Sequence, residues 1–99
     1  MSEKIVKEGL IMLHPIRWDI LVALKEVGKE MYIDPIADRI GKDRRLVSFH
    51  LATLEEYGFL ESEFKVVDKP KSKGKAGRFY KLTPKFDKMR AQLAEIIKG

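Results

Sequence analysis

Cysteine is absent from the 99 residues of this chain. Its absence excludes disulfide bridges, thiolate metal sites and cysteine nucleophiles. Asparagine is absent too, and Gln92 is the single glutamine in a chain dense in lysine and glutamate. Because this bias is found in proteins of hyperthermophiles, the composition is typical of a thermophilic source.

Long apolar runs are also missing. No stretch approaches the roughly 20 apolar residues that a membrane span needs. The opening residues, MSEKIVKEGLIMLHP, carry acids and lack an extended apolar signal segment. We therefore expect a cytoplasmic protein without a membrane partner.

Recognisable catalytic patterns are missing as well. The sequence contains no Gly-rich phosphate loop, no metal-ligand cluster and no nucleophile beside a base at a known spacing. We therefore expect no enzymatic activity, no cofactor and no metal.

What is present suffices for one folded domain. A chain of 99 residues buries only about two thirds of its unfolded surface and cannot support two independent cores. Apolar residues make up 44% of the sequence and charged residues 35%, which leaves enough apolar material for a core. We therefore treat residues 1–99 as a single domain.

The net charge of +5 is concentrated in two short windows. Residues 42–50 hold three bases and one acid, and residues 69–81 hold six bases and no acid. Such clustering is the electrostatic footprint of a nucleic-acid binder. For the second window alone, a lysine-rich loop that keeps the protein soluble is an equally good interpretation.

Apolar spacing predicts two helices at the start of the chain. The first lies around residues 5–13. The second begins at Pro15, which suits a first helical turn, and stops at Gly28. His14, directly before Pro15, is most simply a residue of the helix start.

The next two helices form a helix-turn-helix over about residues 34–57. Asp34 is expected to cap a short helix that ends at Gly41, and Asp43 to cap a longer helix that ends near Tyr57. Two helices joined by so tight a glycine-containing turn are the pattern of a helix-turn-helix.

A β-hairpin is expected over about residues 59–83. Alternation in FLESEFKVV places Leu60, Phe64 and Val66 on one side, and RFYKL forms the returning strand, anchored to the core. An apolar seam at helical spacing predicts a last helix over about residues 84–98. The fold class is therefore α+β and mostly helical.

The helix that follows Asp43 has two unlike faces. Its apolar face and flank are assigned to the core, namely Leu46, Val47, His50, Leu51, Leu54 and Tyr57. The opposite face presents Arg45, Ser48, Phe49 and Ala52, with Arg44 to one side. A recognition helix approaches base edges in the major groove with such a face. The alternative is an ordinary solvated helix face, which an exposed Phe49 fits poorly.

Acidic residues follow this face toward the hairpin. They are Glu55, Glu56, Glu61 and Glu63. Because negative charge repels phosphate, we expect this region to point away from nucleic acid.

Three stretches resemble a known family when they are taken in order. LHPIRWDILVAL, IADRIGKDRRLVSFHLATLEEYGFLES and GRFYKLTPK are similar to the winged helix-turn-helix repressors of the ArsR type, and MarR-type regulators share the pattern. The resemblance implies that the helix from Asp43 enters the major groove and that residues 69–78 are the wing. It also implies that the terminal helices form a homodimer.

The chain departs from the metal sensors of that family. Such sensors place Cys in the second helix of the motif, or Asp and His ligands on the final helix, whereas EMYIDPIADRI and KFDKMRAQLAEIIKG contain neither Cys nor His. Metal sensing is therefore not supported. His14 and His50 are too few to close a metal site unless carboxylates join them. We interpret His50 as packed or locally hydrogen-bonded, with a DNA contact as the alternative.

The residues expected to contact double-stranded DNA come from both basic windows. They are Lys42, Arg44, Arg45, Ser48, Phe49, Lys69, Lys71, Lys73, Lys75 and Arg78. Lysine is a flexible point charge, so the wing is expected to contact phosphates and to add affinity, not base choice.

The apolar seam of the last helix could cover the core or pair with a twofold copy, and we favour the homodimer. The residues expected at its interface are Ile5, Leu10, Trp18, Phe86, Met89, Leu93, Ile96 and Ile97. The leading hypothesis is thus a homodimeric, sequence-specific DNA-binding transcriptional regulator. The alternative is a winged-helix protein-interaction module of a transcription or repair assembly. Whether a small-molecule effector is sensed stays open.

Overall fold

The computed structural model describes residues 3–66 and 76–98. The elements in chain order are α1 (Glu3–Met12), α2 (Pro15–Val27), β1 (Met31–Tyr32), α3 (Ile33–Ile40), α4 (Arg44–Glu56), β2 (Leu60–Val66), β3 (Ala76–Leu82) and α5 (Lys85–Lys98). The predicted α+β fold with a helix-turn-helix and a hairpin is confirmed. Lys69, Lys71, Lys73 and Lys75 lie outside the described residues.

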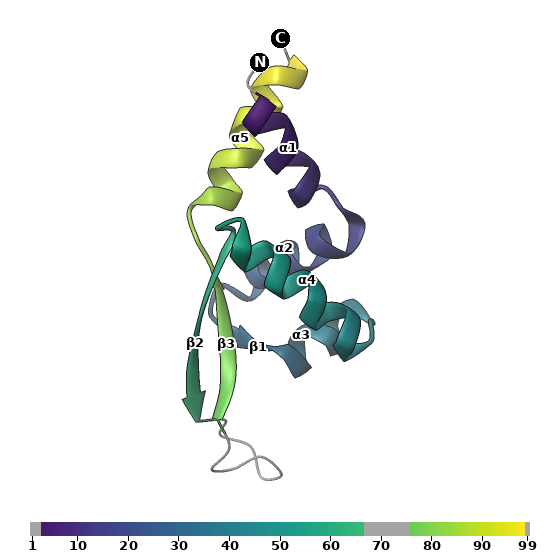
Figure 1. Ribbon diagram of the computed structural model, residues 1–99, viewed down its shortest axis with the longest axis vertical. Coiled ribbons are helices and arrows are strands. Elements are labelled where there is room, and N and C mark those ends of the chain that lie inside the picture. Colours follow the sequence, from purple (N-terminus) through teal and green to yellow (C-terminus); the bar gives the residue numbers. More distant parts are fainter. Residues whose placement is uncertain (1–2, 67–75, 99) are drawn as a thin grey trace.

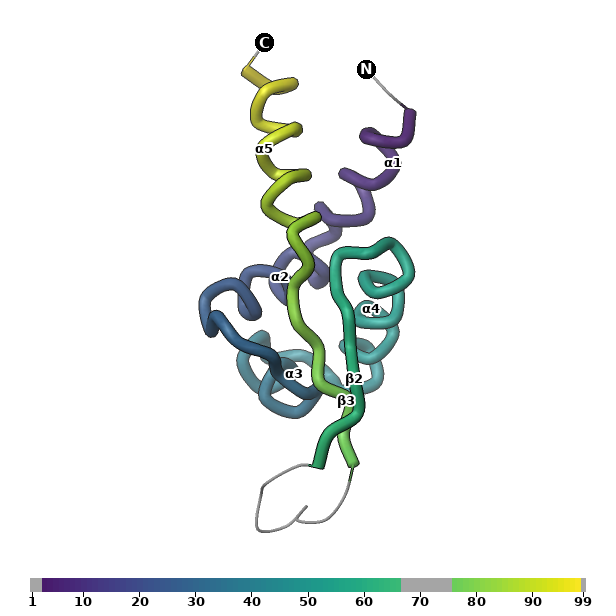
Figure 2. The backbone as a smooth tube through the Cα atoms, turned by 90° about the vertical axis from the view of Figure 1, so that its left-hand side faces the viewer, coloured from purple at the N-terminus to yellow at the C-terminus, as the bar shows by residue number. Residues whose placement is uncertain are grey.

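The molecule is elongated, with principal extents of 51 × 22 × 21 Å. Helices α2, α3 and α4 pack together in the middle, and the hairpin of β2 and β3 extends from them to one end (Figure 1). Helices α1 and α5 extend together toward the opposite end, where both termini lie (Figure 2). The outer end of the hairpin and the terminal helices therefore lie at opposite ends of the molecule. No helix within residues 3–66 and 76–98 combines the length and apolar character of a membrane span.

Two helices begin with a side-chain cap, of which the one at Asp43 was predicted. His14 precedes α2, and its Nδ1 accepts a hydrogen bond from the backbone N–H of Ile16 at 3.2 Å. Asp43 precedes α4, and its Oδ1 accepts from the backbone N–H of Arg45 at 3.4 Å. Side-chain acceptors of this kind satisfy backbone donors that have no partner in the first helical turn.

Helix α3 corrects one expectation, because Asp34 is not its cap. The helix begins at Ile33 after Tyr32, whose side chain makes no capping bond, so Asp34 lies inside the first turn. The cause is β1, which was not predicted: Met31 pairs with Tyr80, and Tyr32 with Phe79. A two-residue strand is too short to produce a recognisable alternating pattern.

The sheet has the strand order β1-β3-β2 and is antiparallel. In the hairpin, Leu60 pairs with Leu82, and the register runs to the pair Val66 and Ala76. Leu60 is buried, whereas Phe64 and Val66, on the same side of β2, are exposed. The hairpin therefore begins against the core and ends beyond it (Figure 1).

The centre of the core is the inner face of α4. Val47, Leu51 and Leu54 have no exposed surface, and they belong to one cluster with buried residues of α2 and α3. Leu46 was assigned to the core as well, but its side chain is 38% exposed. That assignment was wrong because Leu46 lies at the edge of the buried stripe.

Two residues expected at a dimer interface belong instead to the core of the chain. Phe86 and Met89, in the first half of α5, are buried. Trp18 of α2 packs its ring edge-on against Phe86, with ring centroids 5.6 Å apart. The start of the predicted seam therefore covers the chain's own core, and only the later part of α5 leaves apolar side chains accessible.

The two leucines of α4 with different burial provide a matched test of this core. We expect Leu51→Ala to lower the free energy of unfolding by about 2–5 kcal/mol, because it leaves a cavity in a fully buried site. Leu46→Ala, with the same chemistry on the same helix, should cost about 1 kcal/mol or less. Urea unfolding of both variants in the absence of DNA measures the difference, and equal losses would contradict the assigned orientation of α4.

Candidate nucleic-acid interface

An open groove of about 930 Å³ lies between the start of α4 and the outer part of β3. Arg44, Arg45 and Ser48 line it from α4, and Gly77 and Arg78 line it from β3. The fold thus brings together two segments that lie 29 to 34 positions apart in the sequence. Both belong to the basic windows that the sequence marked as a candidate DNA surface.

The arginines at the start of α4 are held differently. Arg44 is exposed, and its Nε lies 3.3 Å from Oδ1 of Asp34 in the first turn of α3. Arg45 and the preceding Lys42 are exposed as well. The N-terminal end of α4 therefore presents positive charge beside the backbone N–H groups of a helix start, which also favour anions.

Phe49 stands on the same exposed face as Arg45 and Ser48. Its side chain is 62% exposed. The only ring contact described for Phe49 within residues 3–66 and 76–98 is edge-on to His50, at a centroid distance of 5.2 Å. An aromatic side chain this open provides an apolar surface of the kind that contacts thymine methyl groups.

Behind this face, Arg17 ties α4 to the helices that support it. His50 is 4% exposed, and its Nδ1 accepts a hydrogen bond from Nε of Arg17 at 3.1 Å. Arg17 also donates from Nη1 to the carbonyl of Ile11 at 3.3 Å. The ring of His14 lies 4.6 Å from the ring of His50. The interpretation of His50 as a packed, hydrogen-bonded residue is confirmed.

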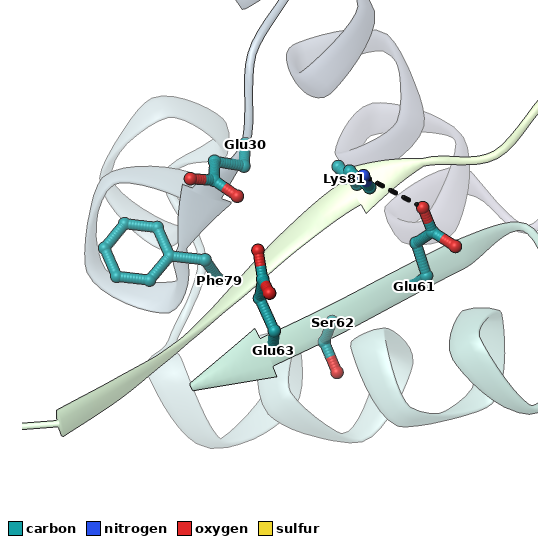
Figure 3. Close-up of a pocket in the computed structure, with 6 residues that line it drawn as sticks. All are labelled: Glu30, Glu61, Ser62, Glu63, Phe79 and Lys81. Atoms are coloured by element: carbon teal, nitrogen blue, oxygen red, sulfur yellow. Dashed lines mark ion pairs between the residues drawn. The ribbon is translucent and has the colours of Figure 1, made fainter. Parts of the chain in front are cut away.

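The back of the hairpin carries the opposite charge. A pocket of about 230 Å³ is lined by Glu30, Glu61 and Glu63, together with Phe79 and Lys81 (Figure 3). Lys81 pairs with Glu61 at 3.1 Å. Lys65 pairs with both Glu30 and Glu63, so the surface holds three glutamates against two lysines. The remaining net negative charge disfavours phosphate. Glu61 and Glu63 thus lie on the back of the hairpin, turned from the groove side.

Glu55 does not line the pocket formed with Glu61 and Glu63 but faces β2 from the last turn of α4. Its Oε2 accepts a hydrogen bond from the hydroxyl of Ser62 at 2.6 Å, across the gap between α4 and β2. Arg78, a predicted phosphate contact, donates from Nη1 to Ser62 Oγ at 2.9 Å. Sequence reasoning missed this contact because nothing in the spacing of residues 55, 62 and 78 marks them as neighbours.

The candidate dimer residues that do not pack in the core lie on α1 and the later part of α5. Leu10 is 66% exposed and Ile97 is 85% exposed, while Ile5, Leu93 and Ile96 are half-buried. Val6 and Leu13 are exposed too. Sequence reasoning left Val6 and Leu13 out, although residues 6, 10 and 13 share one helical face by spacing. Within the described ranges, no three His, Asp or Glu side chains gather as a metal site would require.

A helix-turn-helix followed by a hairpin whose strand lines the same groove defines a winged-helix protein. Residues 14–62 match the family described as "Bacterial regulatory protein, arsR family". These residues therefore carry a helix-turn-helix that is similar to that of the arsR family, and the match supports a DNA-binding transcription regulator. The predicted family resemblance is confirmed.

The fold of the whole chain is similar to that in the "Crystal structure of the diamide-treated YodB from B. subtilis". The TM-score is 0.76 at 17% sequence identity, over 99% of this chain and 90% of that chain. This likeness concerns the fold. No curated protein matches the chain by sequence.

The site predicts a pH dependence of stability. Burial, followed by the nearby His14 and Arg17, lowers the pKa of His50. The unfolded chain therefore takes up a proton at this residue more readily than the folded protein. The contribution of neutral His50 to stability is complete above its pKa in the unfolded chain, about 6.5. It is lost as the pH falls from there through the lower pKa of His50 in the folded protein. We expect the free energy of urea unfolding to decrease between about pH 7 and pH 5.

His50→Gln should flatten this decrease, since glutamine accepts a hydrogen bond without titrating in that range. Asp87→Asn is the control. Lys25 and then Arg90 lower the pKa of Asp87, so the contribution of this carboxyl is lost only below about pH 4. A slope between pH 7 and 5 that is the same in wild type and His50→Gln would contradict the assignment.

Proposed function

We propose that the chain, as one domain, binds specific double-stranded DNA as a homodimer and regulates transcription. The observation that carries the proposal is the groove in which Arg45 and Ser48 of the recognition helix face Arg78 of β3. Helix α4 enters the major groove with its exposed face, and the hairpin lies along the adjacent backbone. The function is binding, without enzymatic activity or a cofactor, and takes place in the cytoplasm.

Base and backbone contacts come from different residue types. Arg45 makes bidentate hydrogen bonds to guanine, Ser48 bonds to a base or phosphate, and Phe49 contacts a thymine methyl group. Lys42 and Arg44 contact phosphates near the start of α4. Lys69, Lys71, Lys73 and Lys75 add phosphate contacts that are independent of sequence.

The homodimer forms through the terminal helices. Helices α1 and α5, which carry the exposed apolar side chains of Val6, Leu10 and Ile97, lie at the end opposite the hairpin (Figure 1), so pairing there leaves both candidate DNA surfaces free. Isologous twofold pairing is the commonest way to cover such a surface. Two recognition helices about 34 Å apart would then read a near-palindromic operator.

The exposed apolar surface of α1 and α5 also favours a second candidate function, that of a protein-interaction module. In that case the same side chains pack against a different protein. The chain by itself then sediments as a monomer and binds no DNA. Selection of bound duplexes from a random pool distinguishes the two, because it reports binding, sequence preference and palindromy together.

Substitutions in the recognition helix and in the second basic window should have different signatures. Arg45→Ala should weaken binding to duplexes with the selected base pair by about 1–3 kcal/mol of binding free energy. It should relax sequence specificity at that position only. The triple replacement of Lys71, Lys73 and Lys75 by Ala should weaken binding to all sequences. It should also reduce the slope of log K against log salt by about one for each lost phosphate contact. Fluorescence anisotropy at several salt concentrations measures both.

Matched controls come from the terminal helices. Arg90→Ala removes an arginine of α5, and replacement of Lys7, Lys88 and Lys98 by Ala removes three exposed lysines of α1 and α5. Neither control should change the base preference or the salt slope. If the controls weaken binding as much as the test variants, net charge and not the proposed surface governs affinity.

The homodimer predicts a mass twice the 11.5 kDa of one chain in sedimentation equilibrium. Leu10→Glu should yield monomers, because a buried carboxylate in an apolar interface is costly. Phe64→Glu is the control, since Phe64 is 65% exposed, as open as Leu10, but lies on the hairpin. This control should remain a dimer. A wild-type chain that sediments as a monomer at micromolar concentration would exclude the homodimer.

A further inference from the structure

Four side chains connect the last turn of the recognition helix to the hairpin. Ser62 donates its hydroxyl to Oε2 of Glu55 at 2.6 Å, and Oγ of Ser62 accepts a hydrogen bond from Nη1 of Arg78 at 2.9 Å. Nη1 of Arg78 also lies 3.9 Å from Oε1 of Glu55. The guanidinium carbon of Arg78 stands 4.4 Å from the ring centroid of Phe64. We call these residues, Glu55, Ser62, Phe64 and Arg78, the hinge network.

The register of the hairpin produces this arrangement. Arg78 is directly opposite Phe64 in the ladder, and Ser62 lies two positions along the same side of β2. In Figure 3 the side chains of Glu61 and Glu63 lie on one side of β2, and Ser62 points to the other. The hinge network therefore occupies the side of the hairpin that faces α4.

The guanidinium of Arg78 stacks on the ring of Phe64 with its flat face, and its N–H groups point toward Ser62 and Glu55. A planar guanidinium stacks on an aromatic ring while its N–H groups donate in the same plane, which a lysine ammonium does not do. The Ser62 hydroxyl uses both its donor and its acceptor, so each bond helps to orient the next. The carboxylate of Glu55 also offsets the charge that Arg78 would present to a phosphate.

We propose that Arg78 is a positioning residue that sets the angle between the hairpin and the recognition helix, and that it does not act as a phosphate contact. This inference rests on the proposed DNA binding and changes the role that the sequence suggested for Arg78. A hairpin held at one angle to α4 loses less conformational freedom when both bind the same duplex.

The two roles predict opposite effects for the neutralisation of Glu55. If Arg78 contacts phosphate, Glu55→Gln removes a competing negative charge and tightens DNA binding. If Arg78 positions the hairpin, Glu55→Gln weakens the hinge network and therefore weakens binding. Ser62→Ala extends the comparison, because it removes the shared hydroxyl without changing any charge.

The experiment measures the affinity for a duplex selected from the random pool, over a series of salt concentrations. We expect Arg78→Ala, Ser62→Ala and Glu55→Gln each to raise Kd roughly 3- to 10-fold, the factor that corresponds to one lost hydrogen bond. The salt slope should stay at the wild-type value, since no phosphate contact is lost. Arg78→Lys should not restore affinity, and the double variant of Ser62 and Arg78 should be no weaker than Arg78→Ala.

Glu61→Gln is the matched control, because it neutralises a glutamate of the same strand on the back of the hairpin. It should change Kd less than about twofold, within the range of a surface ion pair. Thermal unfolding of every variant excludes loss of the fold as the cause. Tighter binding by Glu55→Gln, or a salt slope reduced by about one in Arg78→Ala, would overturn the inference.

A measurement without DNA separates this inference from the proposed function. Residual dipolar couplings of backbone amides in free protein report the orientation of β2 and β3 relative to α4. We expect Ser62→Ala and Arg78→Ala to reduce the hairpin couplings while those of α4 stay constant. Unchanged couplings would refute the positioning role. A wild-type protein that binds no duplex from the pool would instead refute the proposed function.

Discussion

The burial of one face of α4 is the constraint on which the rest of the structure depends. Val47, Leu51 and Leu54 have no exposed surface, so the rotation of α4 about its own axis is determined by the core. Ser48, Phe49 and Ala52, which lie between these positions, must then face outward. The bond from Arg17 to His50 reinforces the same rotation from the flank. A single helix can thus serve the core and a candidate DNA surface, because the two sets of residues never share a side.

The terminal helices are joined to this core by an ammonium group with limited exposure. Nζ of Lys85, at the start of α5, donates to Glu8 of α1 at 2.8 Å and to the carbonyl of Tyr57, which follows α4. It also lies 4.9 Å from the ring centroid of Phe59. The candidate dimer end therefore has a defined position relative to the end of the recognition helix. The hinge network does the same for the hairpin, so both attachments of α4 use charged side chains whose hydrogen bonds are directional.

Much of the fold could be predicted because its signals are local. Asp43 caps α4 and Gly41 ends α3 in the left-handed conformation, with φ of +67°, as their residue types indicate. The misses arose where a distant partner decides the outcome. Strand β1 exists because β3 offers it a ladder, and its formation moves the start of α3 ahead of Asp34. The spacing of Phe86 along its helix predicted an accessible apolar seam, but the ring of Trp18 packs against Phe86.

The sequence by itself determined the order of the five helices and the hairpin, the two faces of the recognition helix and the placement of positive charge in two windows. These properties follow from periodicity and capping, which involve neighbours within one or two turns. Only the tertiary structure decided which charged residues are already engaged. Arg78 meets Glu55 and Ser62, and Arg44 meets Asp34, because packing brings separate elements within bonding distance. A charge count treats every arginine alike, whereas contact distances separate those that face solvent from those that hold the fold in place.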